Sequence, residues 1–218
     1  AMKVSDRADF SKADLTNASI MDVDLTEADF SDANLTNANF TRSLMGSANL
    51  SDATIVKTDF TACNLINADF SGVTLQDVNL EKAGLSRAIF KGTEFNNVNM
   101  VGADLSLTIF DDVDLSKVRL QKAQFAQSTV EDMNFNGQDL TEVVFDKGKV
   151  AGSRFEKAKL NGTSFFDTEV SKNFFKNAQM LKADFDGAYI FKSIFDNAEL
   201  TKANFASANI ESSAFTGA

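Results

Sequence analysis

Large apolar residues recur at every fifth position of this chain, from Phe10 to Phe215. All 42 positions in this series hold Phe, Leu, Ile, Val or Met, and no insertion shifts them. A period of five fits neither an α-helix, where successive copies would turn by about 140°, nor a flat strand, whose side chains alternate with period two. The chain must therefore change direction within each pentad, and so regular a repeat predicts a solenoid.

The other pentad positions explain how the chain turns. The residue two before each large one is small in most pentads, as at Ala8, Ala13 and Ala18, so it points to the same inner side. The residue two after it is often Gly or Asn, which tolerate the positive φ of a type II turn. These corner residues are Gly72, Gly92, Gly102, Gly137, Gly152, Gly162, Gly187, Gly217, Asn17, Asn37, Asn67, Asn97, Asn177 and Asn197. Each pentad therefore predicts one inward pair and one corner.

The remaining two positions complete a signature. Asp or Asn precedes the large residue in 19 of 42 pentads, and Ser or Thr follows it in 16. With pentads such as Ala28-Asp29-Phe30-Ser31-Asp32, the chain resembles the pentapeptide-repeat family over residues 8–218. The resemblance implies an all-β fold, a right-handed quadrilateral parallel β-helix with four pentads per coil. We therefore expect about ten and a half coils over 8–218 without inserted loops, after a lead-in of residues 1–7 in which Ala1 is typical of a cloning remnant.

Counting by four pentads assigns the large residues to four faces. The first face holds positions 10, 30, 50 and onward, the second 15, 35 and onward, the third 20, 40 and onward, and the fourth 25, 45 and onward. Phenylalanines favour the first and third faces in the N-terminal half, and the second and fourth in the C-terminal half. This changeover, near residues 110–135, predicts a change of core packing and of turn type or twist. Local bulges are expected where the small inward residue is replaced, at Met133, Gln138, Gly148 and Asn173.

Composition narrows the function classes. The chain carries a net charge of −10 and has no His, no Pro and one Cys. Acidity disfavours direct nucleic-acid binding and favours a basic partner. No apolar run reaches membrane-spanning length and no leader precedes the repeats, which predicts a cytoplasmic protein, although removal of an upstream targeting segment stays an open alternative.

Candidate chemistry is sparse. Histidine, the commonest general base and metal ligand, is absent. Cys63 occupies a small inward position, where a thiol is expected to be an inert core residue. Asp111, Asp112 and Asp114 lack the spacing of a loop-type calcium site. We therefore predict no catalytic residue, no cofactor and no metal.

Two outward surfaces are candidates for binding a protein partner. The first is apolar and consists of Phe166, Phe174, Leu181, Tyr189, Phe191 and Ile194; Phe174 and Ile194 are four pentads apart, as are Ile89 and Ile109 in the N-terminal half. Exposed apolar stripes mark contact surfaces more often than chance, with solvent-tolerated ladders as the plain alternative. The terminal coils also predict end-to-end pairing of two copies through Phe195, Leu200, Phe205, Ile210 and Phe215.

The second candidate is an acidic face comprising Asp9, Asp29, Asp32, Asp52, Asp69, Asp111, Asp112, Glu131 and Asp132. The family resemblance implies an alternative function here, a DNA mimic that binds a type II topoisomerase. Duplex DNA carries one charge per ~1.7 Å, whereas residues 1–117, the more acidic half, carry only −9. A structural or protein-interaction module is therefore the preferred hypothesis, and mimicry the alternative.

Overall fold

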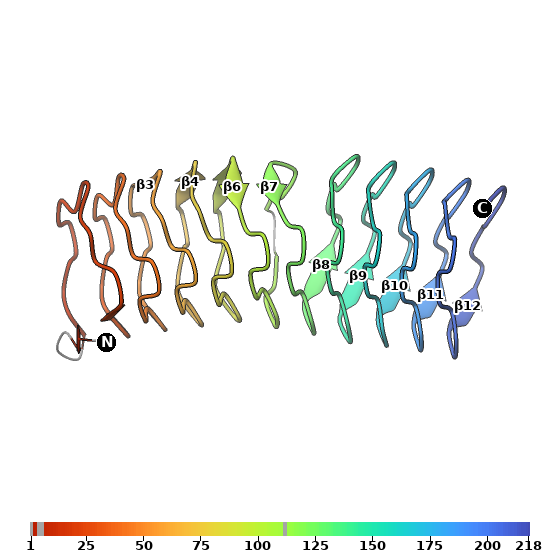
Figure 1. Ribbon diagram of the computed structural model, residues 1–218, viewed down its shortest axis with the longest axis horizontal. Coiled ribbons are helices and arrows are strands. Elements are labelled where there is room, and N and C mark those ends of the chain that lie inside the picture. Colours follow the sequence, from red (N-terminus) through yellow and green to blue (C-terminus); the bar gives the residue numbers. More distant parts are fainter. Residues whose placement is uncertain (1, 4–6, 111–112) are drawn as a thin grey trace. The chain divides into compact units, whose positions relative to one another are not determined.

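The computed structural model describes residues 2–3, 7–110 and 113–218, which form two compact units, Ala1–Arg119 (unit 1) and Leu120–Ala218 (unit 2). The boundary falls inside the segment 110–135, where the sequence predicts a changeover. Short strands follow one another along each unit, and the described residues contain no helix (Figure 1). Unit 1 contains β1 (Met2–Lys3), β2 (Val23–Asp24), β3 (Ile55–Val56), β4 (Thr74–Gln76), β5 (Glu94–Asn96), β6 (Val98–Asn99) and β7 (Val118–Arg119). Unit 2 contains β8 (Thr129–Glu131), β9 (Lys149–Ala151), β10 (Glu169–Ser171), β11 (Tyr189–Phe191) and β12 (Asn209–Glu211).

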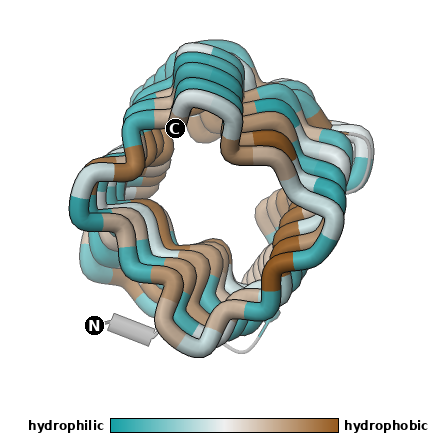
Figure 2. The backbone as a smooth tube through the Cα atoms, turned by 90° about the vertical axis from the view of Figure 1, so that its right-hand side faces the viewer, coloured by the Kyte–Doolittle hydropathy of each residue, from teal (hydrophilic) through white to brown (hydrophobic). Residues whose placement is uncertain are grey.

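The strand pairings are parallel and join each segment to its equivalent four pentads further along the chain. Val150 pairs with Val170 in the sheet of unit 2, and Asp9 forms an isolated bridge with Asp29 in unit 1. The coils of unit 2 follow a four-sided path when viewed along the stack (Figure 2). The predicted right-handed quadrilateral β-helix with four pentads per coil is confirmed. Because residues 111–112 interrupt the description, complete coils among the described residues are fewer than the ten and a half predicted for 8–218.

Nearly every corner places the residue two after the core residue in the left-handed region. φ is 60° at Asn17, as the Gly and Asn signature predicts, but also 60° at Lys12 and 58° at Asp32. The turn is closed by an N–H···O=C bond, for example from Ala33 to Phe30 at 3.0 Å. The corner therefore tolerates many residue types once this bond and the pairing to the next coil are made.

The Asp or Asn before the core residue stabilises the same corner. The Asn34 Oδ1 accepts both the Thr36 N–H, at 3.1 Å, and the Thr36 hydroxyl, at 2.6 Å. This is an Asx turn, in which a short side chain bonds the backbone two residues on. It explains in physical terms why Asp or Asn precedes the core residue and Ser or Thr follows it.

Some faces are extended instead of sharply turned. In unit 1 the three-stranded sheet β3–β4–β5 lies on the second face, whereas in unit 2 the five-stranded sheet β8–β12 lies on the first face. The core residues of the unit 2 sheet are β-branched, a type favoured in strands, namely Val130, Val150, Val170, Ile190 and Ile210. The predicted change in turn type is therefore a change in which face is extended.

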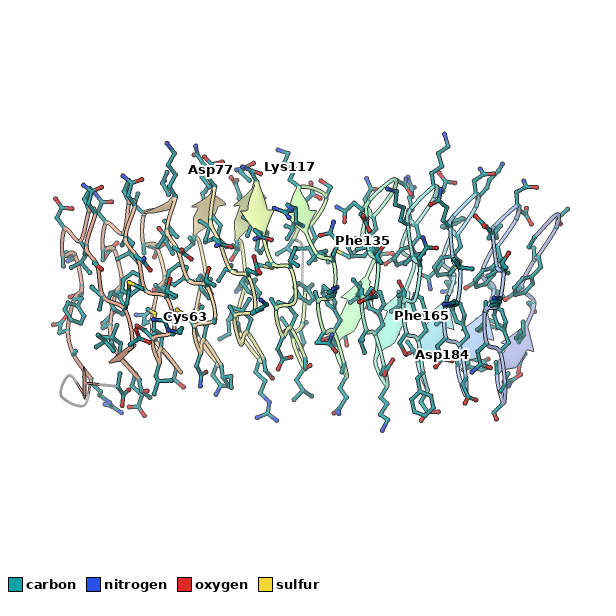
Figure 3. The ribbon with its side chains drawn as sticks, in the orientation of Figure 1. Cys63, Asp77, Lys117, Phe135, Phe165 and Asp184 are labelled. Carbon is teal, nitrogen blue, oxygen red and sulfur yellow. The ribbon has the colours of Figure 1, made fainter. Side chains whose placement is uncertain are left out.

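Stacked phenylalanines fill the core as predicted. In unit 1, Phe10 and Phe30 of the first face stack with ring centroids 5.0 Å apart. In unit 2, Phe175 and Phe195 of the second face stack at 4.6 Å, and Phe165 and Phe185 of the fourth face at 4.7 Å. Figure 3 shows Phe135 and Phe165 within their coils, while Asp77 and Lys117 project outward from unit 1.

A buried polar ladder runs beneath the sheet of unit 2. Where this face is extended, the inward N–H of each coil is bonded by a side chain of the next coil: Ser153 N–H to Asn173 Oδ1 at 2.9 Å, and Asn173 N–H to Ser193 Oγ at 3.2 Å. The Asn173 amide also donates to the Val150 carbonyl at 2.7 Å. The expectation of a bulge at Asn173 is wrong, because the amide completes the hydrogen bonds of a regular coil.

Candidate interaction surface

The sheet of unit 2 presents two columns of outward side chains. One column precedes the core residues and consists of Thr129, Lys149, Glu169, Tyr189 and Asn209; the other follows them and consists of Glu131, Ala151, Ser171, Phe191 and Glu211. A shallow open groove of about 400 Å³ lies over strands β8–β11. We call it the β8–β11 groove; Ala151, Gly152 and Ser171 supply its small lining residues, and Glu131, Asp132, Lys149, Glu169, Lys172, Tyr189 and Phe191 the larger ones.

Two aromatic rings form one end of this groove. Tyr189 and Phe191 stack on β11 with centroids 6.2 Å apart and planes 8° from parallel. Tyr189 is 40% exposed, and its hydroxyl donates to the Glu211 carboxylate at 3.4 Å. Partial desolvation, followed by the nearby Glu211 carboxylate, raises the pKa of Tyr189 above its usual value, so the phenol stays protonated. The ammonium of Lys192 lies 4.8 Å from the Phe191 ring centroid, a cation–π contact.

Charged residues line the other end. The Lys149 ammonium lies 2.6 Å from the Glu131 carboxylate, and this hydrogen-bonded pairing raises the pKa of Lys149. At the corner, Gly152 adopts φ 63°, and a Cβ on it would collide with the Asp132 carboxylate. Only glycine therefore leaves Asp132 in place, and the absence of a side chain there keeps the groove open.

The six residues of the predicted apolar surface lie on four faces. Tyr189 and Phe191 share the first face, and Phe174 and Ile194 are bridge partners on the second, as their spacing of four pentads predicts. By the same count, the other two residues lie apart. Phe166 is on the fourth face, and the Lys147 ammonium lies 5.9 Å from the centroid of its ring. Leu181 is on the third face and is 36% exposed. The structure therefore brings together two pairs rather than one six-residue patch.

The predicted acidic residues divide in a similar way. In unit 1, Asp9, Asp29 and Asp69 lie in one column before the core residue, and each accepts the N–H two residues on, at 2.9 Å. Hydrogen bonds from Ser11, the hydroxyl first, lower the pKa of Asp9. Asp32 and Asp52 are exposed corner residues of unit 1, Glu131 and Asp132 belong to unit 2, and Asp111 and Asp112 lie outside the described residues. Three of these carboxylates thus have a structural role in closing turns.

A second apolar cluster lies on unit 1. Ile89, Leu107 and Ile109 are 48%, 38% and 71% exposed and line a pocket of about 280 Å³ together with Arg87 and Lys91. Ile89 and Ile109 were expected to be neighbours from their spacing. Leu107 at the corner, with φ 61°, was missed, although it is the one large aliphatic residue in a column that otherwise holds polar residues, glycine and Ala62, which was a usable signal.

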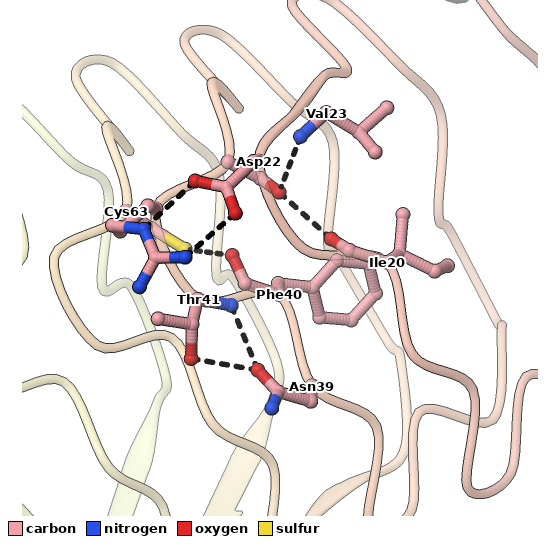
Figure 4. Close-up of polar contacts among 9 residues, drawn as sticks. Ile20, Asp22, Val23, Asn39, Phe40, Thr41 and Cys63 are labelled. Atoms are coloured by element: carbon pink, nitrogen blue, oxygen red, sulfur yellow. Dashed lines mark hydrogen bonds and ion pairs between the residues drawn. The ribbon is translucent and has the colours of Figure 1, made fainter. Parts of the chain in front are cut away.

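No grouping suited to catalysis is visible among the described residues. The Cys63 thiol is buried and donates to the Phe40 carbonyl at 2.7 Å (Figure 4). Burial raises the pKa of Cys63 to about 12, so the reactive thiolate is not formed near neutral pH. The described part of the chain holds no cluster of three or more His, Cys, Asp or Glu side chains able to bind a metal.

The pairing of acidic, basic and aromatic side chains in the β8–β11 groove was also missed by sequence reasoning. Lys149, Glu169 and Lys172 carry no signal singly. Folding the two outward columns at four pentads per coil would have placed them beside Tyr189 and Phe191. The small residues Ala151 and Ser171 can be recognised as the floor of a groove only once the larger residues around them are known.

The core of this four-sided β-helix repeats the same residue types in every pentad, whereas the outward side chains differ from coil to coil. The protein is therefore a repeat scaffold that displays variable side chains on its surface. The chain belongs to the pentapeptide-repeat family: the model described as "Pentapeptide repeats (8 copies)" matches residues 6–42, 43–81 and 183–218, and "Pentapeptide repeat region" matches residues 87–165. No curated protein matches the chain significantly.

Several solved structures are similar to it. HetL, a pentapeptide repeat protein involved in heterocyst differentiation regulation from the cyanobacterium Nostoc sp. strain PCC 7120, is 24% identical over 93% of this chain and 87% of its own, with a TM-score of 0.38. A trypsin-treated form of QnrB1, a plasmid-mediated fluoroquinolone resistance protein, is 15% identical over 96% and 92%, with a TM-score of 0.46. Rfr23, from the cyanobacterium Cyanothece 51142, is 25% identical over 53% and 89%, with a TM-score of 0.28. What this chain shares with these three proteins is the pentapeptide repeat. Among the residues that the structure describes, no helix has the length and apolarity needed to cross a membrane.

Proposed function

We propose that this chain is a non-enzymatic protein-interaction module that binds its partner over the β8–β11 groove. The observation that carries the proposal is the stacked pair of exposed Tyr189 and half-buried Phe191 beside an open groove on a five-stranded sheet. Outward positions of this repeat normally hold small polar residues, and aromatic side chains there bring large contact area with little conformational entropy to lose.

The scaffold supports this role by holding the pair rigidly. Both rings stand on one strand, whose core residue Ile190 is fully buried and paired on both sides, with Val170 and Ile210. A preorganised surface loses less free energy on binding than a flexible one. Around the next corner, Phe174 and Ile194 extend the apolar area of unit 2.

The test is partner capture from cells of the source organism, with the bound proteins quantified by mass spectrometry. Tyr189→Asn together with Phe191→Ser restores the residue types usual at these two positions. The double variant is expected to keep the thermal unfolding midpoint within a few degrees and to lose captured proteins about tenfold or more.

Leu181→Thr is the matched control, because Leu181 is similarly exposed but lies on the third face. It should retain the proteins that the double variant loses. Equal capture by the wild-type chain and the folded double variant would refute the proposed surface.

A second candidate function is DNA mimicry towards a type II topoisomerase, favoured by the five described carboxylates on the first face of unit 1. Five charges over about four coils, each ~4.8 Å high, remain sparser than those of duplex DNA. The test is DNA gyrase supercoiling, with and without a fluoroquinolone, at two salt concentrations. Inhibition or drug protection that weakens with salt and in Asp32→Asn with Asp52→Asn would support mimicry; no effect would exclude it for this enzyme.

We also propose that two copies pair through strand β12. Ile210 on β12 is 42% exposed, whereas its partner Ile190 on β11 is fully buried. A strand paired on one side only offers free backbone groups to another chain.

A further inference from the structure

We propose that the β8–β11 groove binds an extended basic segment of the partner, with one arginine side chain against Tyr189 and a second cation near Asp132. This inference rests on the proposed function and adds the chemistry of the partner. It is argued from the charges around the groove, because apolar area alone would not select a class of occupant.

The cation site at the aromatic end is built from three residues of successive coils. Tyr189 pairs in register with Glu169 on β10, and its hydroxyl donates to Glu211 on β12. The exposed ring therefore lies among two exposed carboxylates. A guanidinium can stack on a phenol ring and bond to carboxylates in one plane, which an ammonium does less well.

The existing cations leave this site open. Lys149 is held by Glu131 at 2.6 Å, and Lys192 lies over Phe191 rather than Tyr189. No lysine or arginine of the described part forms an ion pair with Glu169 or Glu211. Their hydrogen bonds from Ser171, at 3.2 Å, and Asn209, at 3.1 Å, come from neutral groups. Lys149 pairs in register with Glu169 and offsets part of its charge, whereas no described lysine or arginine forms an ion pair with Glu211.

The far end of the groove supplies a second negative group. Asp132 is an exposed corner residue next to Gly152, and no described cation pairs with it within 4.0 Å. From β8 to β11 there are three interstrand steps, or about 14 Å, and Asp132 lies three residues further along its coil than the position that aligns with Tyr189, so the two ends are roughly 17 Å apart. Four residues of an extended peptide span about 13 Å, and residues i and i+4 point to the same side. Two arginines four positions apart can therefore reach both ends, because their long side chains cover the remaining distance.

The same features disfavour other occupants. A nucleic acid would bring phosphates against Glu131, Asp132 and Glu169. An uncharged apolar segment would have to cover the charged groups of Glu169 and Lys172 without compensating them. The small side chains of Ala151 and Ser171 leave room for a peptide backbone between the two ends.

The test uses the full chain and a synthetic probe, fluorescein-Gly-Ser-Arg-Gly-Ser-Gly-Arg-Ser-Gly, in fluorescence anisotropy titrations. We expect binding below ~1 mM at low salt, and at least about tenfold weaker binding by peptides that carry glutamates, or two adjacent arginines, instead. Glu169→Gln with Glu211→Gln should weaken binding about tenfold, as should Tyr189→Leu, while unfolding midpoints stay unchanged.

Glu156→Gln with Glu199→Gln removes the same charge from other faces of unit 2 and is the matched control. Equal loss in the control would show bulk charge attraction and refute the site, as would no binding up to ~1 mM. If the Tyr189→Asn, Phe191→Ser variant loses its cellular partners but Glu169→Gln, Glu211→Gln does not, the interaction surface stands and the basic segment is refuted.

Discussion

Single pentad positions have separable physical roles. Asn34 shows the usual one, because its side chain accepts the N–H and the hydroxyl of Thr36 and so closes a corner. Where the same column holds Ile89, that bond is lost, although the turn itself is kept by Thr93 N–H to Phe90 O at 3.1 Å. A residue that replaces the usual Asp or Asn lowers the local stability of the corner, so its presence indicates that its side chain either packs against a neighbour or serves a function.

Ile89→Asn is predicted to stabilise the chain by about 1 kcal/mol, because the new side chain can accept the Lys91 N–H in an Asx turn. Urea unfolding of the variant and the wild-type chain measures this. A loss of stability would instead show that contacts of Ile89 with its pocket neighbours outweigh the missing hydrogen bond.

Cys63→Ser is predicted to be nearly neutral at pH 8, because Thr58 and Thr93 make the equivalent hydroxyl bond at 2.8 Å. Since the folded pKa of Cys63 is raised from 9.0 to about 12, the wild-type thiol contributes its full stability below pH 9. That contribution is lost as pH rises from 9 to 12, because only the unfolded thiol ionises there.

Near pH 10.5 the wild-type chain should therefore lose about 2 kcal/mol more unfolding free energy than the serine variant. Urea unfolding at both pH values measures the difference. Identical pH profiles would show that the thiol ionises normally in the folded chain.

The sheet of unit 2 depends on residues from successive coils acting together. Asn173 is fully buried, and its amide bonds both Ser153 and Val150 of the preceding coil. Without it, the Ser153 N–H would lie in the core with no acceptor. The buried ladder of Ser153, Asn173 and Ser193 and the outward pair Tyr189 and Phe191 therefore belong to the same sheet, β8–β12.

Asn173→Ala is predicted to cost about 1–3 kcal/mol through the unsatisfied Ser153 N–H, and Asn173→Ser clearly less, because Ser193 already accepts an N–H at the equivalent position. Denaturant unfolding ranks the two variants. Equal losses would show that the cost comes from lost volume rather than from the hydrogen bond.

At the level of the whole chain, repeats contact only their neighbours, so the last strand of the unit 2 sheet, β12, is paired on one side only. For unit 2 the observable is Ile210, which is 42% exposed on β12. Burial of such a residue against a second copy would remove apolar surface from water and supply backbone partners.

Sedimentation velocity at rising concentration is predicted to show a dimer, which Ile210→Lys should dissociate by adding a charge to the pairing edge. Leu181→Thr, on another face, should leave the dimer unchanged. A monomer at all concentrations, or a dimer insensitive to Ile210→Lys, would exclude this mode of pairing.

The sequence by itself determined the pentad period and the corners and, with the four pentads per coil that the family resemblance implies, the ring stacks. Each is set by a local rule repeated in every pentad, so that Phe175 and Phe195 must stack once four pentads make a coil. Only the tertiary structure decided which faces are extended, that Asn173 completes a buried ladder, and that Asp29 closes a turn. It also decided that Tyr189 lies in register with Glu169 and donates a hydrogen bond to Glu211. These outcomes depend on hydrogen bonds and charges between neighbouring coils, which no single pentad encodes.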